Sequence, residues 1–486
     1  MDKFYEALKD VANMTTTQKG MPALISTGSA ILDIFAQIET FRNLDYKSFE
    51  EAIIKAFNED KDLTLKLVFY LRNCRSLGQG ERKVFRHAIH ILARLYSDAM
   101  RKNLEYVPLF GRYDDLYAFV STPLEKDAFN ILKQEAFADL NRGNPSLVGK
   151  WLKSVNASDS DSRFLARLTA QHFGLSLKEY RKMCSCLREK LALVENTLRT
   201  KNYTCIDYDK IPGQAFLKYK EAFLRNDEVK YRMFLEKLKK GYTKINTNTI
   251  YPYQIIQKYL QSNKDENPIN ETLEAMWKNL PKYVSGSHNV LVVVDTSASM
   301  MGLPYNMAVS LAIYLANHNE GIWHNKFITF SERPRFVELK GSTLYENLNS
   351  FTPLYANTNI EAVFDLILAS AISHDLKDED MVKQIIIVSD MQFDDAISTR
   401  LKNRPYTDIV REKFKQASLT MPELVYWNVS GNFKDTFHTS KYAQNAKLVS
   451  GSSPSIFMEV LTSDFKEPYS FMLEILNNDL FNDIKA

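Results

Sequence analysis

One carboxylate and two hydroxyls follow a continuously apolar segment in the C-terminal half of the chain. The segment NVLVVVDTSASMMG contains the apolar run Val290–Val294 and then presents Asp295, Ser297 and Ser299 at alternate positions. Oxygen donors of this kind suit a hard divalent cation such as Mg²⁺, and small hydroxyl side chains let the backbone approach the ion closely. The same serines also suit a turn or a helix cap, so this spacing alone leaves both interpretations open.

Two later positions supply the further oxygen donors that a metal site needs. Thr358 precedes a helical pattern in YANTNIEAVFDLIL, where it also suits the N-terminus of that helix. Asp390 ends a second apolar run, Ile385–Val388, in QIIIVSDMQFD. Because ligands of open α/β sheets bind beyond the carboxyl ends of the strands, we expect both carboxylates at one edge of a sheet. The predicted ligands are therefore Asp295, Ser297, Ser299, Thr358 and Asp390.

The elements that must position these donors form an alternating α/β pattern. Continuously apolar runs are typical of parallel strands buried on both faces, and helical patterns separate them. The predicted strands are Val290–Val294, Lys326–Phe330, Arg335–Leu339, Ile385–Val388, Leu424–Asn428 and Lys447–Val449. The predicted helices begin near Pro304 and Ile360 and cover Thr407–Ser418 and Ser455–Leu461. We expect a doubly wound, Rossmann-like domain over residues 281–486.

The first 280 residues have an almost wholly helical pattern, with apolar residues recurring at three and four positions. Many short helices joined by brief polar turns suggest stacked helix pairs, as in an α-solenoid, although no clean repeat period is evident. Examples are Ala30–Phe41, Leu63–Arg72, Val84–Tyr96, Phe164–Phe173 and Tyr231–Leu238. The polar stretch Gln261–Pro268 is interpreted as a linker or an exposed turn. We expect an all-α module over residues 1–280.

Charge is unevenly divided between these two parts. Residues 281–486 contain 18 Lys and Arg against 24 Asp and Glu, a net charge of −6, and the remainder carries +9. This asymmetry suggests that the N-terminal part meets a polyanion while the C-terminal part holds cations, although a charged face is often only solvated.

Composition indicates a reduced, cytoplasmic protein of several cores. No apolar stretch approaches the roughly 20 residues that span a bilayer, and MDKFYEALKD lacks the apolar core of a secretory signal. The four cysteines show neither disulfide nor zinc spacing. We therefore expect no membrane partner.

The order and spacing of DTSAS at residues 295–299, of Thr358 and of Asp390 resemble the metal-ion-dependent adhesion site (MIDAS) of von Willebrand factor A domains. In that family the serines and the threonine bind the ion directly or by exchange, and the aspartates act largely through water. One position stays open for an acidic ligand oxygen. The resemblance implies Mg²⁺, with Ca²⁺ or Mn²⁺ as alternatives, at the five predicted ligands.

Three upstream stretches resemble the TROVE module of Ro ribonucleoproteins: TTTQKGMPALISTGSAILDIF, LRNCRSLGQGERKVF and VPLFGRYDDLYAF. That family typically combines an R-x-x-R-G-G-x-G-E-R turn with a later P-x-x-G-R-x-D-D-L. Here Ser76 and Leu77 separate Arg75 from Gly78, so the resemblance is to a divergent branch. The run IDYDKIPGQAFLKYKEAFLRND is more similar to an uncharacterised group of TROVE-like proteins of phages, bacteria, plants and fungi.

The TROVE resemblance implies a ring-like module of HEAT-like helical repeats that the von Willebrand factor A domain closes. In the family, misfolded RNA ends enter the hole of the ring, and small structured RNAs bind its outer basic surface. The implied partner of this chain is therefore RNA, either a structured small RNA or a single-stranded end.

RNA binding requires Lys and Arg for the phosphates and planar groups for the bases. One candidate cluster surrounds Gly78 and Gly80, whose conformational freedom lets backbone amides approach a phosphate. Its members are Arg72, Arg75, Arg82, Lys83 and Arg86, and a second cluster comprises Lys150, Lys153, Arg163, Arg167, Lys178, Arg181 and Lys182. The alternative is that Arg75, Glu81, Arg112, Asp114 and Asp115 form structural ion pairs, which we favour for the GRYDD stretch.

The sequence favours a non-catalytic RNA-binding protein of Ro type, without catalytic residues. His87 and His90 share a helical face without a third ligand nearby, and no strand-to-helix G-x-S-x-G is present. Two-metal hydrolysis needs several converging carboxylates, whereas the predicted site is mainly hydroxyl. The alternative is an interaction scaffold that binds an acidic residue of a protein partner at the metal. A third hypothesis is a metal-dependent nuclease or phosphatase.

Overall fold

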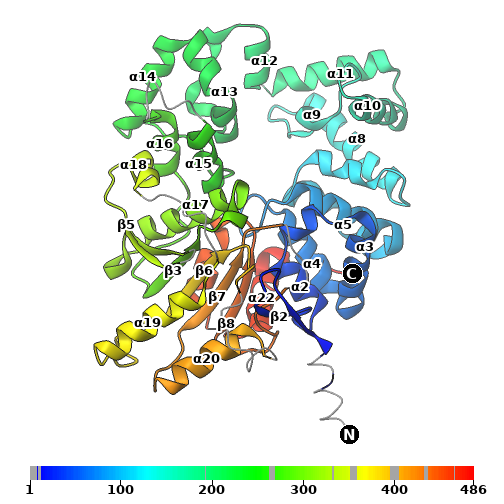
Figure 1. Ribbon diagram of the computed structural model, residues 1–486. Coiled ribbons are helices and arrows are strands. Elements are labelled where there is room, and N and C mark those ends of the chain that lie inside the picture. Colours follow the sequence, from blue (N-terminus) through cyan, green and yellow to red (C-terminus); the bar gives the residue numbers. More distant parts are fainter. Residues whose placement is uncertain are drawn as a thin grey trace. The chain divides into compact units, whose positions relative to one another are not determined.

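The chain forms two compact units in the computed structural model, which describes residues 8, 12–191, 193–261, 269–330, 333–350, 358–394, 404–431, 436–464 and 466–486 (Figure 1). The α/β unit comprises residues 1–60 and 250–478, and the helical unit comprises residues 61–249 and 479–486. These units differ from a division near residue 281, because residues 1–60 and 250–280 cluster with the α/β unit and residues 479–486 with the helical unit. The predicted linker Gln261–Pro268 lies, apart from Gln261, outside the described residues.

Six strands form the central sheet of the α/β unit and confirm the predicted doubly wound fold. They are β3 Val290–Asp295, β4 Lys326–Phe330, β5 Arg335–Glu338, β6 Gln384–Ser389, β7 Glu423–Asn428 and β8 Ala446–Ser450. Their spatial order is β5-β4-β3-β6-β7-β8, and neighbours are parallel except for the pair β4 and β5. The strand order reverses between β3 and β6, so the carboxyl ends of these two strands flank the crevice where such folds bind ligands.

Helices cover both faces of this sheet. The helices of the α/β unit are α2 Ala30–Ala36, α3 Tyr46–Glu59, α15 Pro252–Gln261, α16 Glu271–Lys278, α17 Leu303–His318, α18 Leu344–Asn349, α19 Glu361–Ser373, α20 Tyr406–Gln416, α21 Phe457–Thr462 and α22 Pro468–Leu476. Neighbouring side chains of a strand point to opposite faces. In β7, Tyr426 lies 2.9 Å from the Thr407 hydroxyl of α20, whereas Trp427 packs on Phe457 of α21. Burial on both faces explains the continuously apolar strands.

The N-terminal segment contains a short hairpin that the helical pattern does not predict. Strands β1 (Met14–Thr16) and β2 (Pro22–Leu24) pair antiparallel. The sequence pattern gives no sign of this hairpin, because three-residue strands are too short to show the alternation that identifies a strand. The following helix α2 packs on β8, where the Ser450 hydroxyl donates to the Phe35 carbonyl at 2.6 Å.

The helical unit is built from consecutive helices that pack against one another (Figure 1). They are α4 Lys61–Arg72, α5 Arg82–Leu95, α6 Ser97–Lys102, α7 Val107–Phe110, α8 Glu125–Asn141, α9 Val148–Trp151, α10 Ser160–Phe173, α11 Leu177–Lys190, α12 Val194–Arg199, α13 Gly213–Asn226 and α14 Glu228–Lys239. Local sequence fixes their ends: Asp159 accepts from the Ser162 amide at 2.8 Å, and Gly174 ends α10 in the left-handed conformation. The predicted all-α character of this part is confirmed.

No helix within the described ranges is long and apolar enough to cross a membrane.

Candidate metal centre and cationic surface

The first half of the predicted metal site is a preorganised loop at the carboxyl end of β3. Asp295 is fully buried; its Oδ1 accepts the Ser297 amide at 2.8 Å, and its Oδ2 accepts the Ser389 hydroxyl at 2.6 Å. The hydroxyls of Ser297 and Ser299 lie 3.1 Å apart. Sequence reasoning missed Ser389, although its position at the end of β6, directly before Asp390, signals the same edge of the sheet.

Asp390 brings a second buried carboxylate to this edge. Its Oδ1 accepts the Gln392 amide at 3.0 Å, whereas its Oδ2 is buried without a hydrogen-bond partner among the residues that the structure describes. Burial raises the pKa of Asp295 above its usual range, and the charge of Asp390 raises it further. A positive charge would stabilise these two neighbouring buried carboxylates, one of which has an oxygen with no hydrogen bond to a described residue. The donor set of carboxylates and hydroxyls therefore fits a hard divalent cation.

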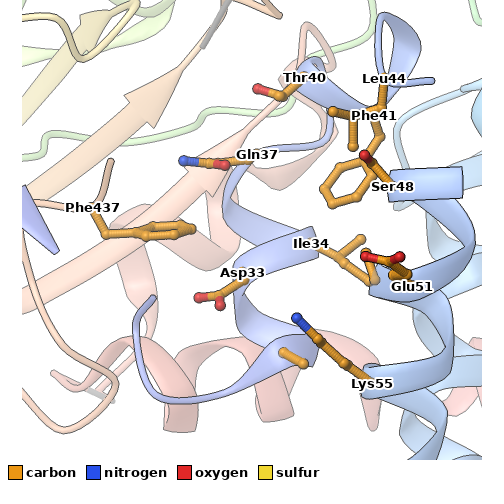
Figure 2. A pocket seen from close by; sticks show the side chains of 12 residues that line it. Asp33, Ile34, Gln37, Thr40, Phe41, Leu44, Ser48, Glu51, Lys55 and Phe437 are labelled. Carbon is orange, nitrogen blue, oxygen red and sulfur yellow. The ribbon is translucent and has the colours of Figure 1, made fainter. Parts of the chain in front are cut away.

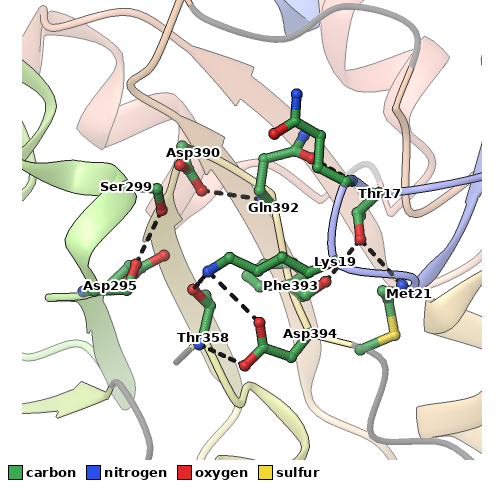
Figure 3. Close-up of polar contacts among 12 residues, drawn as sticks. Thr17, Lys19, Met21, Asp295, Ser299, Thr358, Asp390, Gln392, Phe393 and Asp394 are labelled. Carbon is green, nitrogen blue, oxygen red and sulfur yellow. Dashed lines mark hydrogen bonds and ion pairs between the residues drawn. The ribbon is translucent and has the colours of Figure 1, made fainter. Parts of the chain in front are cut away.

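Thr358 completes the predicted set from the loop before α19. It is fully buried, its amide donates to Asp394 Oδ2 at 2.7 Å, and its carbonyl accepts the Asp394 amide at 3.0 Å. Figure 3 shows the side chains of Asp295, Ser299, Thr358 and Asp390 pointing toward one region. Fold topology thus brings together side chains that lie up to 95 positions apart in the chain.

A lysine that sequence reasoning missed reaches the same region from the hairpin turn between β1 and β2. The Lys19 ammonium donates to the Thr358 hydroxyl and lies 3.5 Å from Asp394 Oδ1 (Figure 3). Its signal in the sequence was weak: Lys19 precedes Gly20, which adopts a positive φ of 95° as a tight turn requires. Nothing local connects that turn to residues 358–394.

In the helical unit, part of the first cationic cluster forms buried ion pairs. Asp115 accepts from Arg72 Nε at 2.8 Å and from Arg86 Nε at 2.7 Å, and Arg86 also pairs with Asp114 at 2.7 Å. The Arg72 side chain is only 3% exposed. Arg72 and Arg86 were predicted to bind RNA, but their guanidinium groups pair with Asp115 and Asp114. Of the ion pairs expected for GRYDD, the structure contains the one between Arg112 and Asp114, at 3.1 Å. Arg75 donates to the carbonyls of residues 108 and 111, each at 3.4 Å.

Two further half-buried cations beside these pairs, Arg112 and Lys153, each contact an aromatic ring. The Arg112 guanidinium stacks on the Trp151 ring at 3.9 Å, and Lys153 lies over the Tyr117 ring. Burial lowers the pKa of Lys153, and the nearby charges of Arg86, Arg112 and Arg82 lower it further, although Asp114 opposes them. The carboxylates of Asp114 and Asp115, which pair with Arg86 and Arg112, balance part of this positive charge.

The members of the second predicted cluster differ in the solvent exposure of their side chains. Lys150 pairs with Glu195 at 3.5 Å, and Arg163 donates to the carbonyls of residues 157 and 158 at 2.8 and 2.6 Å. The exposed members of both clusters are Arg75, Arg82, Lys83, Arg167, Lys178, Arg181 and Lys182. A long charged side chain in solvent can reorient toward a phosphate, so exposure marks the better candidates.

A separate cavity of about 190 Å³ lies in the α/β unit between α2, α3 and Phe437 (Figure 2). Burial raises the pKa of Asp33 on its wall to about 6. The Asp33 carboxylate accepts from the Ser26 hydroxyl at 2.6 Å and from the Thr27 amide at 2.8 Å. These acceptors are used by the turn before α2, and the predicted site residues lie elsewhere.

Two models of domains of unknown function match this chain. A domain of unknown function, DUF2828, matches residues 17–172 and 153–287. The chain belongs to the DUF2828 family. In this DUF2828 protein, a second domain of unknown function, DUF7788, matches residues 289–474. The expected membership of an uncharacterised family is thereby confirmed.

A viral relative and one solved structure are similar to this DUF2828 protein over most of its length. An uncharacterised protein of Acanthamoeba polyphaga mimivirus is 30% identical, over 98% of this chain and 89% of that protein. The crystal structure of the Deinococcus radiodurans Ro (RSR) protein has a TM-score of 0.47 and 13% identity, over 90% of this chain and 100% of that one.

Proposed function

We propose that this DUF2828 protein is a non-catalytic RNA-binding protein whose helical unit holds the phosphate backbone. One observation carries the proposal: the helical unit contains 36 Lys and Arg against 23 Asp and Glu, a net charge of +13, whereas the α/β unit carries −10. The difference in net charge between the two compact units is larger than the difference between the two parts of the chain divided at residue 281. An excess of this size on one folded unit favours a polyanionic ligand, because each neutralised phosphate releases a counterion.

The proposed contacts use the exposed cations and the surface beside the buried pairs. Arg82 lies close enough to Arg112 and Lys153 for its charge to lower the pKa of each. The stacked pair of Arg112 and Trp151 adds planar groups of the kind on which unpaired bases stack. The exposed Lys178, Arg181 and Lys182 on α11 extend the proposed contacts. Either a single strand or a structured RNA suits such a surface, because these side chains contact the phosphate backbone and the faces of bases rather than the base edges.

We further propose that the α/β unit binds Mg²⁺, or Ca²⁺ or Mn²⁺, through Asp295, Ser297, Ser299, Thr358 and Asp390. The proposal is supported by Asp390 Oδ2, which lacks a hydrogen-bond partner within the described part of the chain, and by the proximity of two buried carboxylates. The ion would neutralise that pair and fix the loops after β3 and β6. Two carboxylates with three hydroxyls are a poor set for two-metal hydrolysis, so the ion is assigned no catalytic step.

Crosslinking tests the RNA proposal on the purified full-length chain. The protein is irradiated with a random-sequence RNA pool, and crosslinked peptides are identified by mass spectrometry. We expect crosslinks in peptides that contain Arg82 and residues 167–182, and their loss in an R82E/K178E/R181E variant. Lys340→Glu is the matched control, because this side chain is 80% exposed on the acidic unit. Retention of no RNA, or crosslinks confined to the α/β unit, would refute the proposal.

A further inference from the structure

The hairpin turn between β1 and β2 is hydrogen-bonded to the loop that follows β6. The Thr17 hydroxyl donates to the Phe393 carbonyl at 2.7 Å, and the Gln18 amide donates to Gln392 Oε1 at 3.0 Å. Gly20 forms an isolated antiparallel bridge with Asp394. The same loop begins with Asp390, a proposed metal ligand. Residues 17–20 therefore bind the loop that follows β6, and the first residue of that loop is the proposed metal ligand Asp390.

The Lys19 side chain extends from this turn and places its ammonium group beside Thr358, a proposed metal ligand. Its ammonium donates to the Thr358 hydroxyl and pairs with Asp394, which in turn binds the Thr358 amide at 2.7 Å. The Thr358 hydroxyl oxygen is the atom by which Thr358 would ligate a metal ion. An ammonium hydrogen-bonded to that oxygen occupies its lone pair and repels a second cation strongly at such short range.

We propose that Lys19 is a tethered cation that competes with the divalent ion for the Thr358 side of the site. This inference rests on the proposed metal site and adds its regulation. Ion binding requires the ammonium to leave Thr358, and the turn at residues 17–20 loosens from the loop after β6. The metal and the docked hairpin are thus alternatives, and occupancy of the site is coupled to release of the N-terminal hairpin.

The direct test measures Mn²⁺ binding to the full-length chain by calorimetry and by the loss of the free-ion electron paramagnetic signal. We expect Lys19→Met to bind Mn²⁺ at least about tenfold more tightly than wild type, because charge repulsion and a hydrogen-bond competitor are removed. Lys19→Arg retains the charge and should stay near wild type. Lys340→Met, an exposed lysine of the same unit, should change nothing.

A double variant separates competition from a simple change in net charge. K19M/D394N removes both partners of the ion pair and leaves the local charge unchanged, so competition predicts that it still binds Mn²⁺ more tightly than wild type. A second readout is hydrogen exchange of residues 14–24: Mn²⁺ should speed exchange in wild type and leave an Asp390→Ala variant unaffected.

The outcomes distinguish the inference from the proposal beneath it. Equal Mn²⁺ affinity in wild type and Lys19→Met, with binding lost in Asp390→Ala, would overturn the role of Lys19 and keep the metal site. Absence of binding in all variants that fold like wild type by circular dichroism would overturn the metal site and the inference together. RNA crosslinking to the helical unit would stand in either case.

Discussion

The buried carboxylate of Asp115 provides the sharpest prediction about the helical unit. It accepts hydrogen bonds from Arg72 Nε at 2.8 Å, Arg86 Nε at 2.7 Å and the Arg112 amide at 2.9 Å. Asp115→Ala leaves the Arg72 charge buried at 3% exposure without that partner, whereas Arg86 keeps Asp114. Breaking a buried pair by removing one partner costs about 3–5 kcal/mol, so we expect a loss of unfolding free energy in that range.

Urea unfolding followed by circular dichroism measures this loss, and peptide-resolved hydrogen exchange locates it in residues 61–249. Arg72→Met should also destabilise the unit, and the R72M/D115A double variant should lose less than the sum of the single variants, with a coupling of about 1–3 kcal/mol. Arg101→Ala is the control, because Arg101 pairs with Asp127 at 50% and 35% exposure and should cost less than about 1 kcal/mol. A stable Arg72→Met variant with weakened RNA binding would refute the structural assignment of Arg72.

Three further outcomes follow from the packing and the charges. Gly111→Ala should destabilise the helical unit by about 1–3 kcal/mol in urea, because a Cβ would collide with the Asp115 carboxylate and the Arg72 guanidinium. Burial lowers the pKa of His438 to about 4. Since the unfolded chain binds this proton below about pH 6.5, stability should fall as pH drops from 6.5 to 4, by up to about 3 kcal/mol, and His438→Gln should remove this part of the pH dependence of urea unfolding. Mg²⁺ at 100 times its dissociation constant should stabilise the α/β unit by about 2.7 kcal/mol in thermal unfolding, and Asp390→Ala should abolish that gain.

Much of the α/β unit could be predicted from the sequence because its signals are local. Strands β3 and β6 contain the uninterrupted apolar runs Val290–Val294 and Ile385–Val388, since both faces are covered. Asp295 is the last residue of β3, and Asp390 directly follows β6. Their adjacency in the sheet follows from the doubly wound order, which places Asp295 and Asp390 on one edge. Thr358 could be predicted as an oxygen donor because it directly precedes a helical pattern. Metal binding by these residues remains a prediction.

The contacts that could not be predicted depend on distant partners. Lys19 meets Thr358 across 339 positions, through a hairpin whose three-residue strands carry no periodic signal. Arg72 ends α4 and Arg82 begins α5, yet Arg72 is buried in its ion pair with Asp115 and Arg82 is exposed. The assignment of residues 1–60 to the α/β unit depends on α2 packing on β8, which no local pattern indicates.

The most direct test of the central claim is the salt dependence of RNA binding, measured by fluorescence anisotropy of a labelled RNA with the full-length chain. We predict that log K falls linearly with log salt concentration, that R82E/K178E/R181E weakens binding and flattens the slope by about 1 for each lost phosphate contact, and that a chelator leaves the affinity unchanged. Binding that is absent, insensitive to salt, or lost on chelation would contradict an RNA-binding helical unit that works independently of the metal.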